Sequence, residues 1–253
     1  MRFSAAVLSA CLSLAFMGGI QSTWAQDNVF AQTTAPTAQA TEYEASWQSL
    51  HMGTLVTAKV FGQTPDEVKR LGAIVESEIV RFDDMMSVHK ETALNEVNRS
   101  AGEWVEVTPE IAEMTREALE VADLTDSAFE PTIGPIVNLW KIGFGGHSVP
   151  SDAAIAEALK HVNHRTVALK EEDGRHFLRI EKGQNIDMGA IAKGYIGQKL
   201  ADRLKKEGAK HALLDLGGNV VAVGEKYENP PWRVGRIKPA GRILPLSPPM
   251  TKA

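Results

Sequence analysis

The chain has 253 residues, a formal net charge of -5, and 43% hydrophobic and 23% charged residues. This composition is ordinary for a soluble globular protein, and the length suits one large domain or two small ones. The negative charge balance argues against nucleic acid as a partner, because proteins that bind nucleic acid carry a basic surface.

Residues 1–25 are predicted to be a secretory signal peptide, which favours a periplasmic location. Arg2 precedes an apolar run over 5–20, and the small residues Thr23 and Ala25 fit the positions before a cut after Ala25. Residues 26–43, rich in Gln, Thr, Ala and Pro, are predicted to be a disordered leader.

Cys11, the only cysteine, offers an alternative to this cut. The letters LSAC fit a lipoprotein cleavage box that ends at Cys11, but the apolar stretch before it is very short, so we favour the cut after Ala25. A chain cut after Ala25 contains no cysteine, which excludes disulfides, thiolate metal sites and a cysteine nucleophile.

Residues 44–235 are interpreted as one domain in which helices and strands alternate irregularly. Strands are predicted at 47–62, 103–107, 164–183 as a hairpin, before Ile186, at 211–224 as a pair, and around Trp232. Helices are predicted at 64–86, 90–100, 108–125, 150–162 and about 190–207, with a short one inside the loop 127–146. Hairpins among helices favour an α+β fold, with antiparallel strands and packed helices, over a doubly wound parallel sheet.

The helix over 64–86 has the clearest start signal. Thr64 is predicted to be its N-cap, Pro65 its first residue and Glu67 the partner of a capping box. At the other end of the chain, residues 236–253 form an irregular tail of Pro, Arg and Leu without a period, so we expect the domain to be incomplete.

The letters NIDMGAIAKGY, residues 185–195, allow two interpretations from the residues alone. In the first, Asp187 is the N-cap of the following helix and Lys193 is a solvated helix residue. In the second, the helix start is an anion and metal site, where Gly189 and Ala190 let a ligand approach the backbone and Lys193 binds phosphate. The stretch alone does not decide between them.

Other stretches have plain structural interpretations. The loop 128–135 is predicted to be rigid because Pro and Gly constrain it, and 215–219 is predicted to be a tight turn. His161 and His164 are two of seven scattered histidines, and neither has a nearby acid or cysteine in the sequence to complete a zinc set.

Five stretches occur in a distinctive order: HMGT at 51–54, DDMMSVHKETALNEVN at 83–98, FEPTIGPIVNLWKIGFG at 129–145, IDMGAIAKGY at 186–195 and LLDLGGNVVAVG at 213–224. In this order, and after a secretory signal, they resemble the FAD:protein FMN transferases, the ApbE-type flavin transferases. The resemblance covers about residues 47–235.

The resemblance implies an enzyme that binds FAD and Mg²⁺ outside the cytoplasm. It would transfer the FMN part of FAD to a threonine hydroxyl of a redox partner protein and release AMP. The flavin contacts implied by the resemblance fall on Met52, His89, Ala128, Phe129, Glu130, Asp187 and Lys193. The backbone carbonyl of Ala190 matches a magnesium ligand. Membrane association would come from lipidation or through the acceptor protein.

The chain departs from the family pattern in three places. His89 stands where tyrosine or tryptophan is usual, and Glu130 stands where aspartate is usual. The C-terminal TSG and HIIDP segments and a late Asp and Thr, which complete the family's magnesium site, are not found in the sequence, and no catalytic base can be named. Two alternatives therefore stay open: an FAD pyrophosphatase, and a truncated flavin-binding fragment without turnover.

Overall fold

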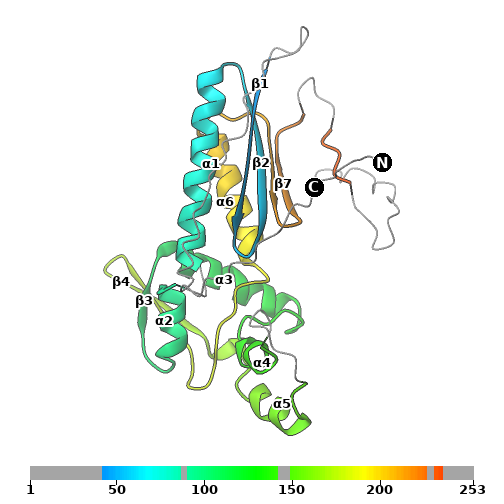
Figure 1. Ribbon diagram of the computed structural model, residues 1–253. Helices are drawn as coiled ribbons and strands as arrows, with labels where there is room; N and C mark the ends of the chain where they lie inside the picture. Colours follow the sequence, from blue (N-terminus) through cyan, green and yellow to red (C-terminus); the bar gives the residue numbers. More distant parts are fainter. Residues whose placement is uncertain (1–41, 87–89, 142–148, 227–230, 236–253) are drawn as a thin grey trace, which may run out of the picture.

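The computed structural model describes residues 42–86, 90–141, 149–226 and 231–235, and mixes helices with antiparallel strands (Figure 1). The helices are α1 (Pro65–Met86), α2 (Ala93–Arg99), α3 (Pro109–Leu124), α4 (Gly134–Leu139), α5 (Asp152–Leu159) and α6 (Ala192–Lys206), with a short 3-10 helix η1 (His164–Thr166). The strands are β1 (Tyr43–His51), β2 (Thr54–Gly62), β3 (Val105–Val107), β4 (Ala168–Glu172), β5 (Arg175–Arg179), β6 (Ala212–Leu216) and β7 (Asn219–Val223). The predicted α+β fold is confirmed.

The larger sheet has four antiparallel strands in the order β1-β2-β6-β7, and α1 and α6 cover one of its faces (Figure 1). Alternate residues of β2 and β6 point toward these helices, where they are buried with the apolar stripe of α1 that the sequence predicts. Each buried Val, Leu, Ile or Phe of this core stabilises the fold by about 1.5–3 kcal/mol. On the opposite face Leu50 and Leu55 are 72% and 50% exposed.

The smaller sheet contains β3, β5 and β4 in that spatial order. Asp173 and Gly174 connect β4 to β5 with φ angles of 52° and 73°, the left-handed values that a tight hairpin turn needs. The predicted hairpin is therefore confirmed. The residues before β4 form η1, so the strand begins at Ala168, four positions later than predicted.

The start of α1 is confirmed, with one change in its capping box. The Thr64 hydroxyl accepts a hydrogen bond from the Glu67 N–H at 3.2 Å, as predicted. The Glu67 carboxylate accepts from the N–H of Gln63 at 2.7 Å, one residue before the cap. The Glu67 N–H is one of the groups that an isolated helix start leaves without a partner.

Three predicted boundaries differ from the structure. Trp232 lies in an irregular segment, where its indole N–H donates to the Gly224 carbonyl at 2.9 Å, and not in a strand. Ile186 does not end a strand, since this stretch makes only an isolated parallel bridge between Ile133 and Asn185. β1 begins at Tyr43, one residue before the predicted domain start.

The segment 185–187 is extended and obtains its hydrogen bonds from distant parts of the chain. The side-chain amide of Asn98, on α2, donates to the Ile186 carbonyl at 3.0 Å and accepts from the Ile186 N–H at 2.7 Å. On its other side the Asn185 carbonyl accepts from the Gly134 N–H at 3.1 Å. Ile186 is buried, so its backbone groups have no access to water as an alternative partner.

None of the described helices combines the length and the apolar character that crossing a membrane requires.

The first prediction uses two glycines that differ in available space. A Cβ at Gly134 would lie 2.1 Å from Asn185 Oδ1, whereas a Cβ at Gly72, inside α1, would meet no atom within 4 Å. We expect Gly134→Ala to lower the free energy of unfolding by about 1–3 kcal/mol through overpacking. Gly72→Ala should leave it unchanged or raise it by up to about 1 kcal/mol through helix propensity. Urea unfolding of both variants measures this, and an equal effect would contradict it.

The second prediction concerns the support of Ile186. Asn98→Ala should lower the free energy of unfolding by about 1–3 kcal/mol, because a buried N–H and a buried carbonyl lose their partners. Asn138→Ala, at an exposed position on α4, is the matched control and should change stability by less than about 0.5 kcal/mol. The same unfolding assay reads both, and a harmless Asn98→Ala would refute the role of this amide.

Candidate functional site

Residues 187–193, here called the junction, lead into α6, and Asp187 is not the N-cap of that helix. The N-cap position is Ile191, which makes no side-chain capping bond, and α6 begins at Ala192. Asp187 lies four residues earlier, where its Oδ1 accepts a hydrogen bond from the Gly189 N–H at 2.7 Å. Of the two interpretations of Asp187, the helix cap is therefore wrong, and the carboxylate instead shapes the turn that leads into the helix.

Two groups at this junction are available to a ligand. Ala190 is exposed, and within the described residues its carbonyl receives no hydrogen bond. Lys193 is half-buried in the first turn of α6, and its ammonium forms no hydrogen bond or ion pair with any described residue. The N–H groups of Ile191 and Ala192 already donate to the Met188 carbonyl, so the ammonium of Lys193, which pairs with no described residue, is the group placed to bind an anion such as phosphate.

The loop 128–131 is anchored to the end of α3. Asp126 and Ser127 take left-handed backbone angles, with φ of 49° and 64°, and turn the chain away from the helix. The Ala128 N–H then donates to the Thr125 carbonyl at 2.9 Å, and the Phe129 N–H donates to the Thr125 hydroxyl at 3.1 Å. Phe129 also packs against the core, so this part of the loop is held on two sides.

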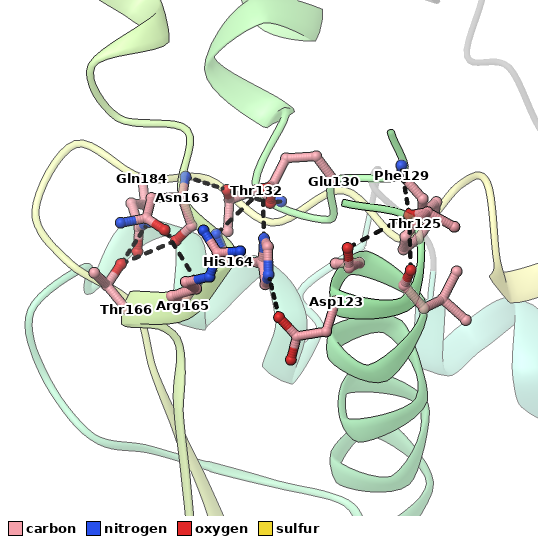
Figure 2. A network of polar contacts seen from close by, with 12 residues as sticks. Asp123, Thr125, Phe129, Glu130, Thr132, Asn163, His164, Arg165, Thr166 and Gln184 are labelled. Carbon is pink, nitrogen blue, oxygen red and sulfur yellow. Dashed lines mark hydrogen bonds and ion pairs between the residues drawn. The ribbon is translucent and has the colours of Figure 1, made fainter. Parts of the chain in front are cut away.

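The carboxylate of Glu130 is occupied by contacts inside the protein. Its Oε1 accepts from the Thr132 N–H at 2.9 Å and the Thr132 hydroxyl at 2.7 Å. Its Oε2 accepts from the backbone N–H and the ring Nδ1 of His164 at 3.3 and 2.8 Å. Figure 2 shows this group at the centre of a polar network that reaches Asn163 and Gln184. These contacts give Glu130 a role in fixing the loop.

Burial and hydrogen bonding oppose each other in this network. Burial by itself raises the pKa of Glu130, but hydrogen bonds from Thr132 and His164 outweigh it, and the pKa lies below its ordinary value. Burial by itself lowers the pKa of His164, but its hydrogen bonds to Asp123 and Glu130 outweigh that effect, and the pKa lies above its ordinary value. The network therefore favours a carboxylate and an imidazolium side by side.

The structure brings the loop and the junction together. The Pro131 carbonyl accepts a hydrogen bond from the Asp187 N–H at 2.9 Å, next to the bridge between Ile133 and Asn185. Ala128, Phe129 and Glu130 thus belong to a loop in direct contact with the junction that carries Asp187, Ala190 and Lys193. Six of the eight predicted site residues lie on these two adjoining segments.

The other two predicted site residues are not on these segments. Met52 lies between β1 and β2, and His89 lies outside the described residues. Met52 occupies the turn between β1 and β2 with a left-handed φ of 51°. Asp83 holds this turn: its Oδ1 accepts from the Met52 N–H at 2.8 Å, and its Oδ2 lies 3.3 Å from Nδ1 of the buried His51. Within the described chain, no hydrogen bond or ion pair joins Met52 to the other predicted residues.

A surface cleft of about 550 Å³ lies between α3 and α6 and reaches the junction at Ala190. Glu113 lies on its wall and accepts hydrogen bonds from the Tyr195 hydroxyl and from Lys199. The cleft is lined by Glu113, Glu117, Ala190, Ile191, Gly194, Tyr195, Gln198, Lys199, Asp202 and Asn219. Its acidic side chains outnumber its single lysine, so its charge disfavours a phosphate anion. We therefore do not assign the phosphate groups of FAD to this cleft.

The described residues do not by themselves form a magnesium site. Mg²⁺ prefers six oxygen ligands and is usually held by one or two carboxylates together with water and substrate phosphates. The described part of the chain offers the free Ala190 carbonyl but contains no group of three or more His, Cys, Asp or Glu residues placed to bind a metal.

Sequence reasoning missed the residues that support the site. Asp83 and Asn98 begin and end one of the motif stretches, but their spacing gives no sign of the backbone groups they hold. His164 was treated as an isolated histidine because its partners, Asp123 and Glu130, lie 41 and 34 positions earlier in the chain. Only the tertiary structure shows that they meet.

Comparisons with known proteins agree with this arrangement. The sequence pattern of the ApbE family matches residues 52–250. An FAD:protein FMN transferase of Klebsiella pneumoniae is 36% identical over 196 residues, which cover 77% of this chain and 58% of that protein. Another, of Treponema pallidum, is 32% identical over 213 residues, which cover 78% of this chain and 59% of that protein.

Solved structures give the same result for the fold. The crystal structure of the ApbE protein of Thermotoga maritima matches with a TM-score of 0.71 at 29% identity and covers 79% of this chain and 66% of that one. The flavin transferase ApbE of Vibrio cholerae matches with a TM-score of 0.69 at 24% identity, which supports the fold alone. The chain spans 58% and 59% of the length of the two curated relatives named above. Because the family pattern covers most of its residues, the chain belongs to the ApbE family.

Proposed function

We propose that this protein is an FAD:protein FMN transferase, which moves the FMN part of FAD to a threonine hydroxyl of a redox partner protein and releases AMP. Its relatives of 30% identity or more carry that name. The observation that carries the proposal is the hydrogen bond between Pro131 and Asp187, since it joins the two segments that the resemblance assigns to FAD.

In the proposed reaction the threonine oxygen attacks the phosphorus on the FMN side of the diphosphate. The bond from that phosphorus to the bridging oxygen breaks, AMP leaves with that oxygen, and the threonine proton passes to a base or to water. Lys193, whose ammonium pairs with no described residue, would stabilise the charge that develops on the phosphates. Ala128 and Phe129 would contact the flavin from the neighbouring loop.

The requirement for Mg²⁺ belongs to this proposal as an implication of the resemblance. The carbonyl of Ala190, which accepts no hydrogen bond from a described residue, supports it, because such a backbone oxygen can serve as one of several oxygen ligands. When bound, the ion would neutralise phosphate charge.

The third prediction compares two lysines of α6. Lys193→Ala should slow transfer of FMN by about a hundredfold, the usual effect of removing one electrostatic stabiliser of a transition state. Lys206→Ala, at an exposed position near the end of the same helix, should leave the rate unchanged. The protein is incubated with FAD, Mg²⁺ and a threonine-bearing acceptor protein, and flavin fluorescence of the acceptor is read in a denaturing gel.

Measuring AMP and free FMN in the same samples separates the alternatives. AMP with labelled acceptor supports transfer, whereas AMP with free FMN and no label indicates an FAD pyrophosphatase. FAD binding without AMP indicates a flavin-binding fragment without turnover. Equal rates for Lys193→Ala and Lys206→Ala would remove Lys193 from the site.

We further propose that the protein acts in the periplasm after a cut that follows Ala25. The support is the apolar run over 5–20 with small residues before the cut. The fourth prediction is that mass spectrometry of the exported protein finds Gln26 as its first residue. An intact Met1 in a cytosolic fraction would contradict export, and a lipid on Cys11 would establish the lipoprotein alternative.

A further inference from the structure

His164 connects the loop 128–131 to α3 through both of its ring nitrogens. Its Nε2 lies 3.0 Å from Oδ1 of Asp123, near the end of α3, and its Nδ1 lies 2.8 Å from Oε2 of Glu130 (Figure 2). The His164 side chain is 2% exposed, and that of Glu130 is 11% exposed. The contact between His164 and Glu130 therefore lies inside the protein.

The chemistry of the partners fixes the protonation state of the ring. An ionised carboxylate can only accept hydrogen bonds, so each ring nitrogen that faces one must carry a hydrogen. Neutral histidine has a single N–H and can satisfy only one of the two carboxylates. Both contacts together require the imidazolium form, in which each is a charge-assisted hydrogen bond.

The charges around His164 favour the same form from both sides. Within the described chain, the charged groups that contact the ring are Asp123 from α3 and Glu130 from the loop, and both are negative. Gln184, which supports η1 by donating to the Asn163 carbonyl and the Thr166 hydroxyl, is neutral.

We propose that His164 is a positioning residue, which in its doubly protonated form fastens the loop 128–131 to the end of α3. When the ring loses a proton, its hydrogen bond to Asp123 breaks. Asp123 is the side that releases because its side chain is 66% exposed and can turn to water. Glu130, nearly buried, keeps the remaining N–H. The consequence for FAD binding rests on the proposed function, whereas the fastening itself does not.

The sign of the pH dependence follows from the raised pKa of His164. A group whose pKa is higher in the folded protein stabilises the fold fully below its ordinary pKa of about 6.5 and loses that effect as pH rises through the folded pKa. Stability and, if the loop holds flavin, FAD affinity should therefore both fall as pH rises above neutrality.

The fifth prediction tests this with His164→Gln, whose amide has no titratable proton. Between about pH 5.5 and pH 8.5, the unfolding equilibrium constant of the wild type should rise by about tenfold, the effect of one charge-assisted hydrogen bond. FAD affinity, measured by quenching of flavin fluorescence, should fall by about threefold or more over the same range. Both changes should be absent in His164→Gln and retained in the control His161→Gln, which replaces a nearby histidine whose side chain makes no hydrogen bond with a described residue.

Asp123→Asn gives a second test if His164→Gln does not fold. It keeps an oxygen acceptor but removes the charge, so the pH midpoint of the stability change should move to a lower value.

An identical pH dependence of stability in wild type and in these variants would overturn the proposal. The His164→Gln variant could lose the pH dependence of stability but keep the pH dependence of FAD affinity. That result would make His164 purely structural and refute its positioning role. A wild type that binds no FAD at any pH would refute the proposed function, while the stability measurements still decide the fastening.

Discussion

The site depends on how the extended segment 185–187 obtains its hydrogen bonds. A buried backbone segment outside a sheet is costly unless each polar group finds a partner. Here the Asn98 side chain serves both backbone groups of Ile186, and the loop 131–134 serves Asn185 and Asp187. Because the partners come from α2 on one side and from the loop 131–134 on the other, satisfying this segment also places the two halves of the site against each other.

The sequence predicted those parts of the fold that depend on neighbouring residues, such as helix starts and tight turns. The cap Thr64 accepts the expected N–H at the start of α1, and the turn at 173–174 has the backbone angles of a tight hairpin. The strands expected at Ile186 and Trp232 were wrong because an apolar stretch becomes a strand only if a neighbouring strand pairs with it. That condition depends on tertiary structure, which a single stretch of sequence does not contain.

The sequence predicted which segments form the site but not how their side chains are oriented. The motif stretches identified the loop 128–131 and the junction 187–193, and the structure joins them. The direction of each side chain was not predictable: Asp187 bonds within its own turn, and Glu130 faces inward. Nothing in the sequence around His164 indicates that two acids meet its ring.

The departure at Glu130 has a structural explanation in this network. The resemblance implies aspartate at this position, and glutamate extends the carboxylate by one methylene, about 1.5 Å of additional bond length. That reach lets one oxygen accept both groups of Thr132 while the other accepts from the His164 ring. With the backbone in the same place, the shorter side chain would leave His164 facing Asp123 alone.

The long-range contacts that build the site also determine when it can form during folding. Asn98 and Ile186 are 88 positions apart, and Asp123 and His164 are 41 apart. Contacts of such separation form only after long loops have closed, whereas α1, α3 and the β4–β5 hairpin rest on local contacts that form early. The site therefore forms only after these loops have closed, as does the pairing of β2 with β6, in which Val56 lies opposite Leu216. It also depends on few hydrogen bonds, so it can open locally at a lower free-energy cost than unfolding of the sheet and its helices.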